Sequence, residues 1–473
     1  MTRQGVTQFL LNHAEEKPVS FHMPGHKGSD IYRKFGHSAF LENFIDCDIT
    51  EIPGADNLFQ TEGVIKATAD KYTELYGVKK SYLLINGTSG GLIAAVLASV
   101  PQGKKLVMAR NCHKSVFNAL TLGGIEPVYA YPSMIEEYGI SGQIEPEEIA
   151  RCLDENPEAE AVILPSPNYY GICSDIKKIA EVVHERGKVL IVDQAHGAHL
   201  KFMDGEPLAA EECGADIVVN STHKTLASFT QSAVLNYNSD RVEQYVLEDK
   251  LQAIQSTSPS YILMASLDIN ADILAEQGEY LFTLWKINIE DFYAKAAEIP
   301  GLKLMDVPGA MDKTKINIDM SYYGIDGNQL EEILMSKGIY SELVTGNILM
   351  CMTGIGNTTG DFFRLLEALK EIAEGGFAGA EGEKKSDDNG AALWMKKRAL
   401  HVIPKKKQLV PLEESEGCIC ASSIIPYPPG IPFVCPGEKI GREEIEYIKL
   451  LRSRGEKVIG VDENMCVVVG ESV

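Results

Sequence analysis

Short apolar runs alternate with longer stretches of mixed polarity through residues 46–255. Four of these runs are bounded by turn residues, which is typical of buried strands. They cover residues 82–85, 105–109, 189–192 and 216–219. Strands that alternate with helices in this way favour a parallel sheet with helices on both faces. After residue 255 helical stretches predominate, followed by an alternating, strand-like run at residues 315–320.

Two polar groups follow the last two of these runs. Asp193 ends the third run, and Lys224 follows the fourth. This order of strand, acid, strand and lysine is able to hold pyridoxal phosphate. Lys224 would bind the cofactor covalently and hand it to a substrate amine, while Asp193 would keep the ring nitrogen protonated. Each residue alone also fits a structural interpretation, namely a surface lysine or an acidic strand end.

A phosphate site is predicted after the first run. Gly87, Thr88 and Ser89 form a turn that opens an apolar helix expected over residues 92–100. Free backbone N–H groups and the positive end of the helix dipole suit a phosphate there. Taken alone, the same residues also describe an ordinary helix capped by Thr88 or Ser89.

An aromatic partner for the cofactor is expected after the second run, where His113 follows the strand. We assign its imidazole to stacking on the pyridine ring, although a single histidine in such a place is more often structural. Candidate groups now follow four successive strands. Ligands of open α/β sheets bind at the carboxyl ends of the strands, so we expect these groups to meet in one site.

The chain resembles the Orn/Lys/Arg decarboxylase family, a bacterial group of pyridoxal-phosphate enzymes with the aspartate aminotransferase-type fold. The segments that carry the resemblance keep the family's order over nearly the whole chain. They are residues 21–28 (FHMPGHKG), 48–54 (DITEIPG), 86–91 (NGTSGG), 111–115 (NCHKS), 193–199 (DQAHGAH), 221–225 (STHKT), 256–261 (STSPSY) and 426–432 (PYPPGIP). The length is similar to the short form of the family, which lacks an N-terminal receiver-like domain.

The resemblance implies a pyridoxal-phosphate fold-type I large domain with a mostly parallel seven-stranded sheet, plus smaller α/β C-terminal domains. It also implies decarboxylation of a basic L-amino acid, which would be arginine, lysine or ornithine, to the amine and CO₂ for polyamine or diamine metabolism. Ser221 and His223 are expected to contact the phosphate opposite Thr88 and Ser89. His196 is expected to orient Asp193 or to contact the ring, and Lys224 or His223 to return the proton.

Two details of the pattern concern the surroundings of the cofactor. Gln194 stands where the family usually has glutamate, which puts the polar network beside Asp193 in doubt. Recognition of the distal cation of the substrate needs a carboxylate, and one loop-like segment offers several candidates: Asp46, Asp48, Glu51 and Asp56. Nothing in the motif assigns a role to His199, for which we expect a position at the surface or behind the site.

The pattern divides the chain into five parts. An N-terminal arm covers residues 1–45, and the cofactor-binding large domain covers residues 46–255. A small α/β subdomain covers residues 256–374, a flexible linker residues 375–390, and a C-terminal α/β domain residues 391–473. The linker is expected because Gly, Glu and Lys dominate it.

Composition narrows the function class. A net charge of −23 without a basic tract argues against nucleic acid. Neither a secretion signal nor an apolar run of membrane-spanning length is visible, so we expect a cytoplasmic protein. The ten cysteines are expected to be reduced thiols. Cys418 and Cys420 lack a second pair at zinc-like spacing, so we expect a buried strand there and no metal.

Two other functions remain open on these residues. An aminotransferase would use the same lysine and aspartate, but it usually has an arginine clamp for the α-carboxylate. Arg364 is the one arginine between Val242 and Lys397, and its surroundings do not resemble such a clamp. A catalytically silent homologue with a regulatory role is the second alternative. The resemblance further implies a homodimer or higher homo-oligomer with the active site at the interface.

Overall fold

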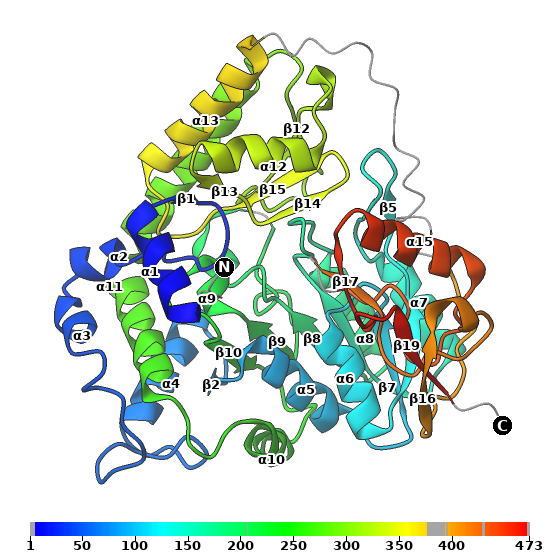
Figure 1. Cartoon of the computed structure of the whole chain (residues 1–473). Coiled ribbons are helices and arrows are strands. Elements are labelled where there is room, and N and C mark those ends of the chain that lie inside the picture. The colour runs from blue at the N-terminus through cyan, green and yellow to red at the C-terminus, as the bar shows by residue number, and fades with distance from the viewer. Residues whose placement is uncertain (1–4, 206, 376–392, 394–395, 428–430, 471–473) are drawn as a thin grey trace.

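A seven-stranded sheet forms the centre of the computed structural model, which describes residues 5–205, 207–375, 393, 396–427 and 431–470 (Figure 1). The order is β2-β10-β9-β8-β7-β3-β4, and only β10 runs antiparallel to its neighbours. The predicted mostly parallel seven-stranded sheet is therefore confirmed. The strands are β2 (Lys80–Leu84), β3 (Lys105–Ala109), β4 (Glu126–Ala130), β7 (Ala159–Pro165), β8 (Val189–Asp193), β9 (Ile217–Asn220) and β10 (Ala233–Tyr237).

Helices cover both faces of this sheet because successive side chains of a strand point to opposite sides. Leu84 packs into the core that α5 (Gly87–Ser99) and α10 (Gln244–Ile254) share. Leu83 and Ile85 pack instead with α4 (Val64–Tyr76) and the start of α11. The other helices of this unit are α6 (Lys114–Gly123), α7 (Pro146–Glu155), α8 (Ile176–Glu185) and α9 (Thr222–Thr225).

The helix expected over residues 92–100 begins five residues earlier, at Gly87. The predicted phosphate turn is thus the first turn of the helix itself. Adding a Cβ atom to Gly91 would bring it within 2.8 Å of side chains from Leu84 and Val219, so a glycine lets this helix lie close against the sheet.

A second unit lies above the sheet in Figure 1. The 36-residue helix α11 (Tyr261–Ala296) packs on α4 with its first half and on α13 (Thr359–Glu374) with its second. An antiparallel sheet of order β11-β12-β15-β14 completes the unit, together with α12 (Gly327–Ser336). Its strands are β11 (Lys303–Leu304), β12 (Lys315–Asp319), β14 (Leu343–Thr345) and β15 (Ile348–Met352). The strand-like run predicted at residues 315–320 is confirmed as β12.

The N-terminal arm joins both units. It contains α1 (Val6–Glu16), α2 (Asp30–Lys34), α3 (Ser38–Glu42) and β1 (Val19–Ser20), which pairs with β13 (Ile339–Tyr340). After β1 the arm passes between α9 and the loop that follows β15. The Gly25 N–H donates to the carbonyl of His223 at 2.7 Å, and the Gly25 carbonyl accepts from the N–H of Gly356 at 3.0 Å. A Cβ on Gly25 would lie 2.5 Å from the carbonyl oxygen of Leu226, so only glycine fits.

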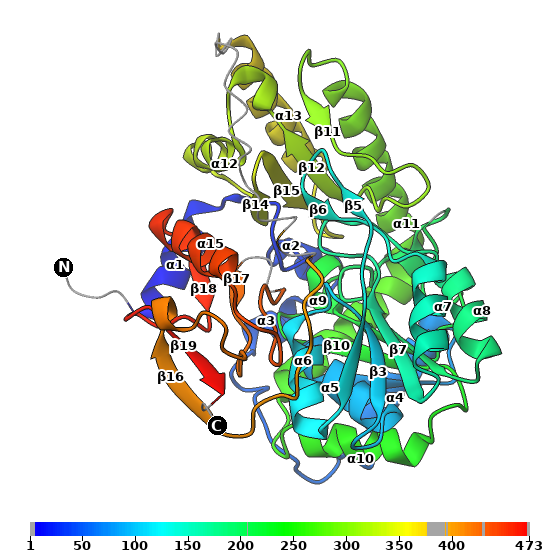
Figure 2. The ribbon, with the colours of Figure 1, turned by 90° about the vertical axis from the view of Figure 1, so that its right-hand side faces the viewer.

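The C-terminal unit has its own small core and packs beside the large sheet (Figure 2). Strand β16 (Lys407–Pro411) pairs with β19 (Cys466–Gly470), and β17 (Ile425–Tyr427) pairs with β18 (Lys457–Ile459), next to α15 (Arg442–Ser453). Cys420 is buried but belongs to an isolated bridge to Val469, so the strand predicted at Cys418 and Cys420 was wrong. The predicted linker at residues 375–390 lies, apart from residue 375, outside the described residues.

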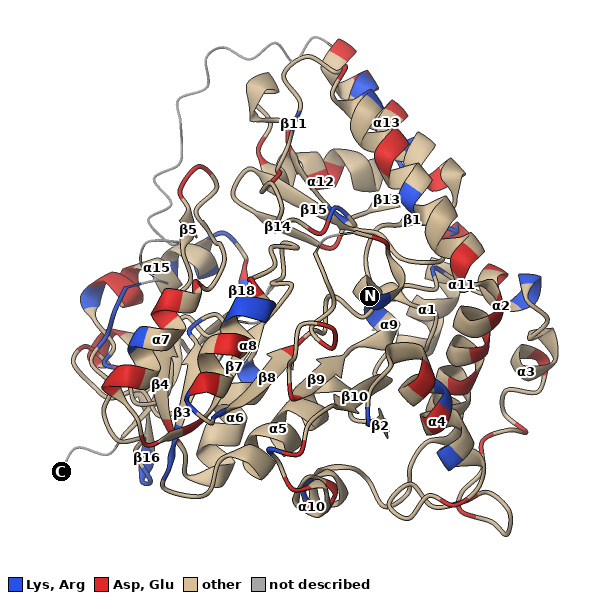
Figure 3. Ribbon diagram, turned by 180° about the vertical axis from the view of Figure 1, so that it is seen from behind, with Lys and Arg blue, Asp and Glu red and all other residues tan. Residues whose placement is uncertain are grey.

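Among the helices that the structure describes, none has the length and apolar character needed to cross a membrane. Acidic and basic residues alternate along outer helices such as α13, as Figure 3 shows. Charged side chains of both signs are therefore carried by these outer helices.

A buried ion pair joins the C-terminal unit to the large sheet. Arg110 follows β3, and its guanidinium contacts the carboxylate of Glu438 at 3.1 Å, with both side chains at most 1% exposed. Arg110 also donates to the carbonyls of Pro432 and Phe433. Because Arg110 lies three residues before His113, this pair links the C-terminal unit to a strand end that carries a candidate site residue.

Glu438→Gln should lower the free energy of unfolding by about 3 kcal/mol, because it leaves the buried Arg110 guanidinium without its counter-charge. Urea unfolding, followed by tryptophan fluorescence and circular dichroism, measures the change. Glu137→Gln is the matched control, since Glu137 pairs with Lys303 at the surface, where both side chains are more than half exposed. Equal changes in the free energy of unfolding for the two variants would show that the buried Arg110–Glu438 pair contributes no more to stability than a surface pair.

Candidate active site

The predicted site residues gather at one edge of the large sheet. Strands β2, β3, β8 and β9 run parallel, so their carboxyl ends meet at the same edge. The α5 turn, His113, Asp193 and Lys224 follow these four ends in turn. The sheet therefore brings together groups that lie far apart in the sequence, as the position of a ligand site in such sheets predicts.

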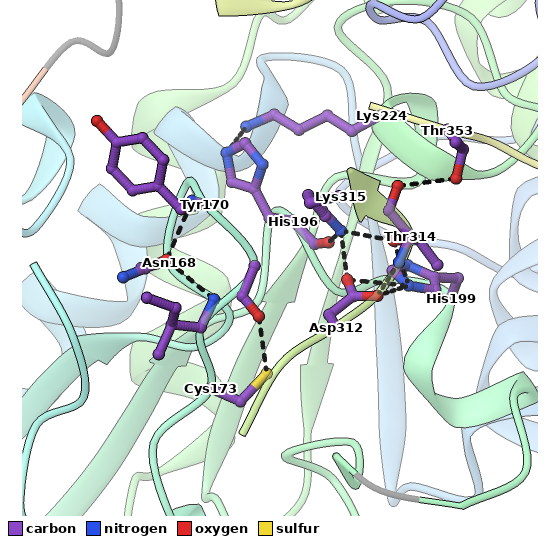
Figure 4. A network of polar contacts seen from close by, with 12 residues as sticks. Asn168, Tyr170, Cys173, His196, His199, Lys224, Asp312, Thr314, Lys315 and Thr353 are labelled. Atoms are coloured by element: carbon purple, nitrogen blue, oxygen red, sulfur yellow. Dashed lines mark hydrogen bonds and ion pairs between the residues drawn. The ribbon is translucent and has the colours of Figure 1, made fainter. Parts of the chain in front are cut away.

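Lys224 lies in α9 directly after β9, and its side chain is half-buried. Its Nζ donates to Nε2 of His196 at 2.9 Å (Figure 4). Burial lowers the pKa of Lys224 below its ordinary value, and the positive charge of Lys315 lowers it further, whereas Asp193 and Glu342 raise it. A depressed pKa leaves more of the amine neutral, which is the form that reacts with a carbonyl group.

Asp193 ends β8 and is 5% exposed. Burial raises the pKa of its carboxyl group, while the positive charge of Lys224 and the N–H of Ala195, which donates to Oδ1 at 3.1 Å, lower it. A buried carboxylate of this kind is suited to pair with a protonated ring nitrogen, because the low local dielectric strengthens the interaction.

His113 caps the N-terminus of α6 and accepts hydrogen bonds at Nδ1 from the backbone and the hydroxyl of Ser115. Burial lowers the pKa of its imidazole to about 3, and the charge of Lys224 contributes to the lowering. The ring is therefore neutral at physiological pH. A neutral imidazole held by its cap is compatible with the predicted stacking role, which stays a prediction.

The predicted phosphate cradle has donors from two elements. Thr88 Oγ1 and Ser221 Oγ lie 3.1 Å apart. The start of α5 and the residue before α9 therefore place their hydroxyl groups side by side. The first N–H groups of α5, which include those of Gly87 and Ser89, lack intrahelical partners by the geometry of a helix start. Gly87 has a φ of +67°, a conformation that glycine adopts without strain. This arrangement suits a phosphate.

Two further histidines flank Lys224 in different ways. The ring of His196 lies tilted against that of Tyr169, with ring centroids 4.5 Å apart, and its hydrogen bond goes to Lys224. No bond joins it to Asp193 in the part of the chain that the structure describes, and the alternative, that it contacts the cofactor ring, stays a prediction. Its Nδ1 is buried without a partner among the described residues. His223 donates from Nδ1 to the carbonyl of Ser232 at 2.8 Å, and burial lowers its pKa to about 4.

Gln194 belongs to a buried network that accounts for its departure from the family pattern. Its amide nitrogen donates to the carboxylate of Glu211 and to Asn220, each at 2.9 Å. Its amide oxygen accepts from the N–H of Ala210. A glutamate at position 194 would place a second carboxylate against Glu211, so the amide is the residue that this network accommodates.

The structure also changes the interpretation of several acidic residues. Asp56 closes its own loop, because its carboxylate accepts from five backbone N–H groups between residues 57 and 66. Glu51 accepts from the side chain of Asn57. The carboxylate that acts electrostatically on Lys224 from the second unit is Glu342, which the sequence analysis missed. It accepts from Tyr169 Oη at 2.8 Å and from the N–H of Met23 at 2.9 Å.

His199 was expected at the surface or behind the site, and it is fully buried behind it. It belongs to a network with Asp312, Thr314 and Lys315, none of which the sequence analysis singled out. These residues come from the second unit. Their only sequence signal is the lysine three residues after the aspartate, which is too common to indicate a site.

Comparison with known proteins agrees with this arrangement. A family model described as "Orn/Lys/Arg decarboxylase, major domain" matches residues 5–292, and a model of the family's C-terminal domain matches residues 380–469. Arginine decarboxylase of Bacillus subtilis (strain 168) is 34% identical over 472 residues, which cover 96% of this chain and 95% of that protein. The chain belongs to the Orn/Lys/Arg decarboxylase family.

Membership in this family places the chain among amino-acid decarboxylases and confirms the predicted family. The crystal structure of the Francisella novicida lysine decarboxylase LdcF superposes with a TM-score of 0.75 at 21% identity and covers 94% of this chain and 78% of that one. Sphingomonas wittichii serine palmitoyltransferase superposes with a TM-score of 0.57 at 16% identity and covers 76% and 87%. These likenesses confirm the predicted fold class.

The decarboxylase family and its fold imply pyridoxal phosphate, and the residues present fit this group. Asp193 is a buried carboxylate at a strand end, and Lys224 is a half-buried amine with a lowered pKa. Hydroxyl groups and helix N–H groups converge between Thr88 and Ser221. Each functional part of the cofactor, namely phosphate, ring nitrogen and aldehyde, therefore has a chemically matched group at this edge of the sheet.

His113→Ala should weaken binding of pyridoxal phosphate roughly tenfold, whereas His113→Phe should bind it nearly as well as the natural protein. The phenyl ring keeps an aromatic face against the cofactor, and the methyl group does not. Titrating the cofactor into each apoprotein, followed by fluorescence, measures the affinities. Equal affinities for all three proteins would return His113 to a purely structural role as the cap of α6.

Proposed function

We propose that this chain binds pyridoxal phosphate through Lys224 and decarboxylates a basic L-amino acid, releasing CO₂ and the corresponding amine. One observation supports this most strongly: four parallel strand ends bring a lysine with a lowered pKa, a buried carboxylate, a neutral imidazole and a candidate phosphate cradle to one edge. None of these groups alone is specific for a pyridoxal-phosphate enzyme. Their combination at one sheet edge, in a member of this family, is specific.

Each residue has a task in the proposed reaction. When bound, pyridoxal phosphate supplies the electron sink that makes the carboxylate a leaving group. Asp193 would hold a proton on the ring nitrogen, and His113 would lie on the ring face. Lys224 would exchange places with the substrate amine. Because the pKa of His223 lies near 4, this imidazole carries no extra proton at neutral pH. Lys224 is therefore the better donor of the proton that replaces the carboxylate.

Arginine is the substrate that the comparisons favour among the three basic amino acids. Four relatives from Bacillus and Halalkalibacterium that bear the name arginine decarboxylase are 30–34% identical to this chain. The relatives named lysine decarboxylase are 23% identical. Decarboxylation of arginine would feed polyamine synthesis.

Glu342 is our candidate for recognising the distal cation of the substrate. Its carboxylate raises the pKa of Lys224, so its charge reaches the reacting amine. The hydroxyl of Tyr169 and the N–H of Met23 fix its two oxygens. A carboxylate held in this way suits a guanidinium, which donates paired hydrogen bonds.

Transamination finds less support in the structure. Arg364, the one arginine between residues 242 and 397, lies exposed on α13, and its guanidinium donates to the carbonyl of Lys337. It is engaged at the surface of the second unit rather than at the sheet edge that carries Lys224. The silent-homologue alternative is left without an observation that favours it.

A homodimer is part of the proposal. Helix α1 buries none of its side chains in the single chain. Its large apolar residues are more than half exposed, and so are others in the arm, in the segment before α4 and at the first residue of α4: Val6, Phe9, Leu10, Leu11, Ile45, Ile52 and Val64. Exposed apolar surface of this extent is typical of an interface. A second copy of the chain that covers these residues would bury them.

Purified protein supplied with pyridoxal phosphate should release CO₂ from arginine faster than from lysine or ornithine, and should form no keto acid.

Glu342→Gln should raise KM for arginine at least tenfold and change kcat much less, because the variant loses the charge that pairs with the distal cation. Glu371→Gln is the control, since Glu371 pairs with Lys337 on the surface of α13. Keto-acid formation without CO₂ would contradict decarboxylation, and an unchanged KM would remove Glu342 from substrate recognition.

A further inference from the structure

Lys315 is a lysine without contact to solvent that lies behind the candidate active site. It begins β12 in the second unit and is 0% exposed. Its Nζ contacts the carboxylate of Asp312 at 2.5 Å and the hydroxyl of Thr314 at 3.2 Å. Its remaining hydrogen bond goes to the backbone carbonyl of His196, which belongs to the large sheet unit. Lys315 thus connects the two units through one buried ammonium group.

The partners of Lys315 are themselves fixed by buried contacts. His199 from the large unit contacts the Asp312 carboxylate at 3.2 Å, and its ring lies tilted against Trp285, with ring centroids 5.1 Å apart. Trp285 Nε1 donates to Thr353 Oγ1 at 2.8 Å, and this hydroxyl donates to the carbonyl of Thr314. Figure 4 shows the cluster beside His196 and Lys224. The ion pair is therefore held in one geometry from both units.

In space, His196 lies between Lys315 and Lys224. Lys315 bonds the backbone of His196, and the ring of His196 accepts from Lys224 Nζ. Any shift of Lys315 would therefore move the residue against which Lys224 lies. The charge of Lys315 also lowers the pKa of both Lys224 and His196, so the coupling is electrostatic as well as mechanical.

Packing alone does not require a charge at position 315. Replacing a buried ion pair by apolar side chains of similar size is often neutral or stabilising, because both ions lose their hydration on burial. Burial would raise the pKa of Asp312, yet Lys315 and His199 lower it well below its ordinary range, so the carboxylate is ionised opposite a positive group. Because this charged pair lies beside the reactive amine of Lys224, we infer that the charge of Lys315 has a function in the site.

We propose that Lys315 is a positioning residue of the active site that holds His196 against Lys224 and places a second positive charge beside the reactive amine. The proposal rests on the proposed function of Lys224. It gives the second unit a direct part in tuning the reactive amine. Two carboxylates oppose Lys315 by raising the pKa of Lys224, namely Asp193 from the large unit and Glu342 from the second unit. The neighbouring imidazoles of His113, His196 and His223 have lowered pKa values and carry no charge at neutral pH.

The test is a pH titration of the absorption spectrum of the substrate-free holoenzyme, which reports the proton on the nitrogen that joins Lys224 to the cofactor. Lys315→Met should raise the midpoint by about one pH unit, a tenfold gain in proton affinity, because a positive neighbour is removed. Asp312→Asn should lower the midpoint, because the charge of Lys315 is then uncompensated. Lys315→Arg should leave it near that of the natural protein. Opposite shifts from the two members of one ion pair would not arise from loosened packing.

Two further variants keep the test decisive. Lys71→Met is the matched control, since Lys71 pairs with Asp268 and Asp272 between α4 and α11, away from the sheet edge, and should shift nothing. The double variant Lys315→Met with Asp312→Asn leaves no unpaired buried charge. It should fold where a single variant does not, and should still raise the midpoint.

The outcomes separate this inference from the proposed function. If the natural protein forms no titrating complex with pyridoxal phosphate, the proposed role of Lys224 fails. If the natural protein titrates and the folded double variant has the same midpoint, the proposed role of Lys315 alone is overturned. A shift of the Lys71 variant equal to that of the Lys315 variant would also overturn it.

Discussion

The partial removal of the Lys224 amine from solvent is the constraint on which the other features of the site depend. Loss of hydration disfavours an ammonium group, so burial lowers the pKa of Lys224, and the nearby carboxylates of Asp193 and Glu342 raise it again in part. The structure places near this nitrogen a carboxylate from each unit, a neutral imidazole that accepts its hydrogen bond, and the buried Lys315. The reactivity of the amine depends on the balance of these charges.

That balance requires three parts of the chain to keep fixed positions. The arm passes between α9 and the second unit, where Gly25, Gly354 and Gly356 let three backbones approach closely. A side chain on any of these glycines would occupy space already taken by a neighbouring backbone. The C-terminal unit reaches the end of β3 through Arg110 and Glu438. Lys224 and His113 are therefore each positioned by contacts with segments distant in the sequence.

The sequence was sufficient to predict the sheet and the residues at its edge, because these depend on local patterns. Apolar runs become buried strands, and parallel strands bring Asp193 and Lys224 to the same edge whatever the loops do. The start of α5 was placed too late, because the turn at Gly87 is helical rather than a separate loop. Glu342, Asp312 and Lys315 could not be found in this way, because their meaning depends on contacts with residues more than 100 positions away in the chain. The amide of Gln194 is likewise explained only by a contact in the folded chain, with Glu211.

The central claim is that Lys224 is the residue that carries pyridoxal phosphate, and reductive trapping tests it most directly. The holoenzyme is treated with borohydride, digested, and mapped by mass spectrometry. The expected result is that the cofactor's mass is found on the peptide that contains Lys224, and that Lys224→Ala protein retains none. Attachment to another lysine, or no attachment at all in protein that binds the cofactor, would contradict the assignment of the site.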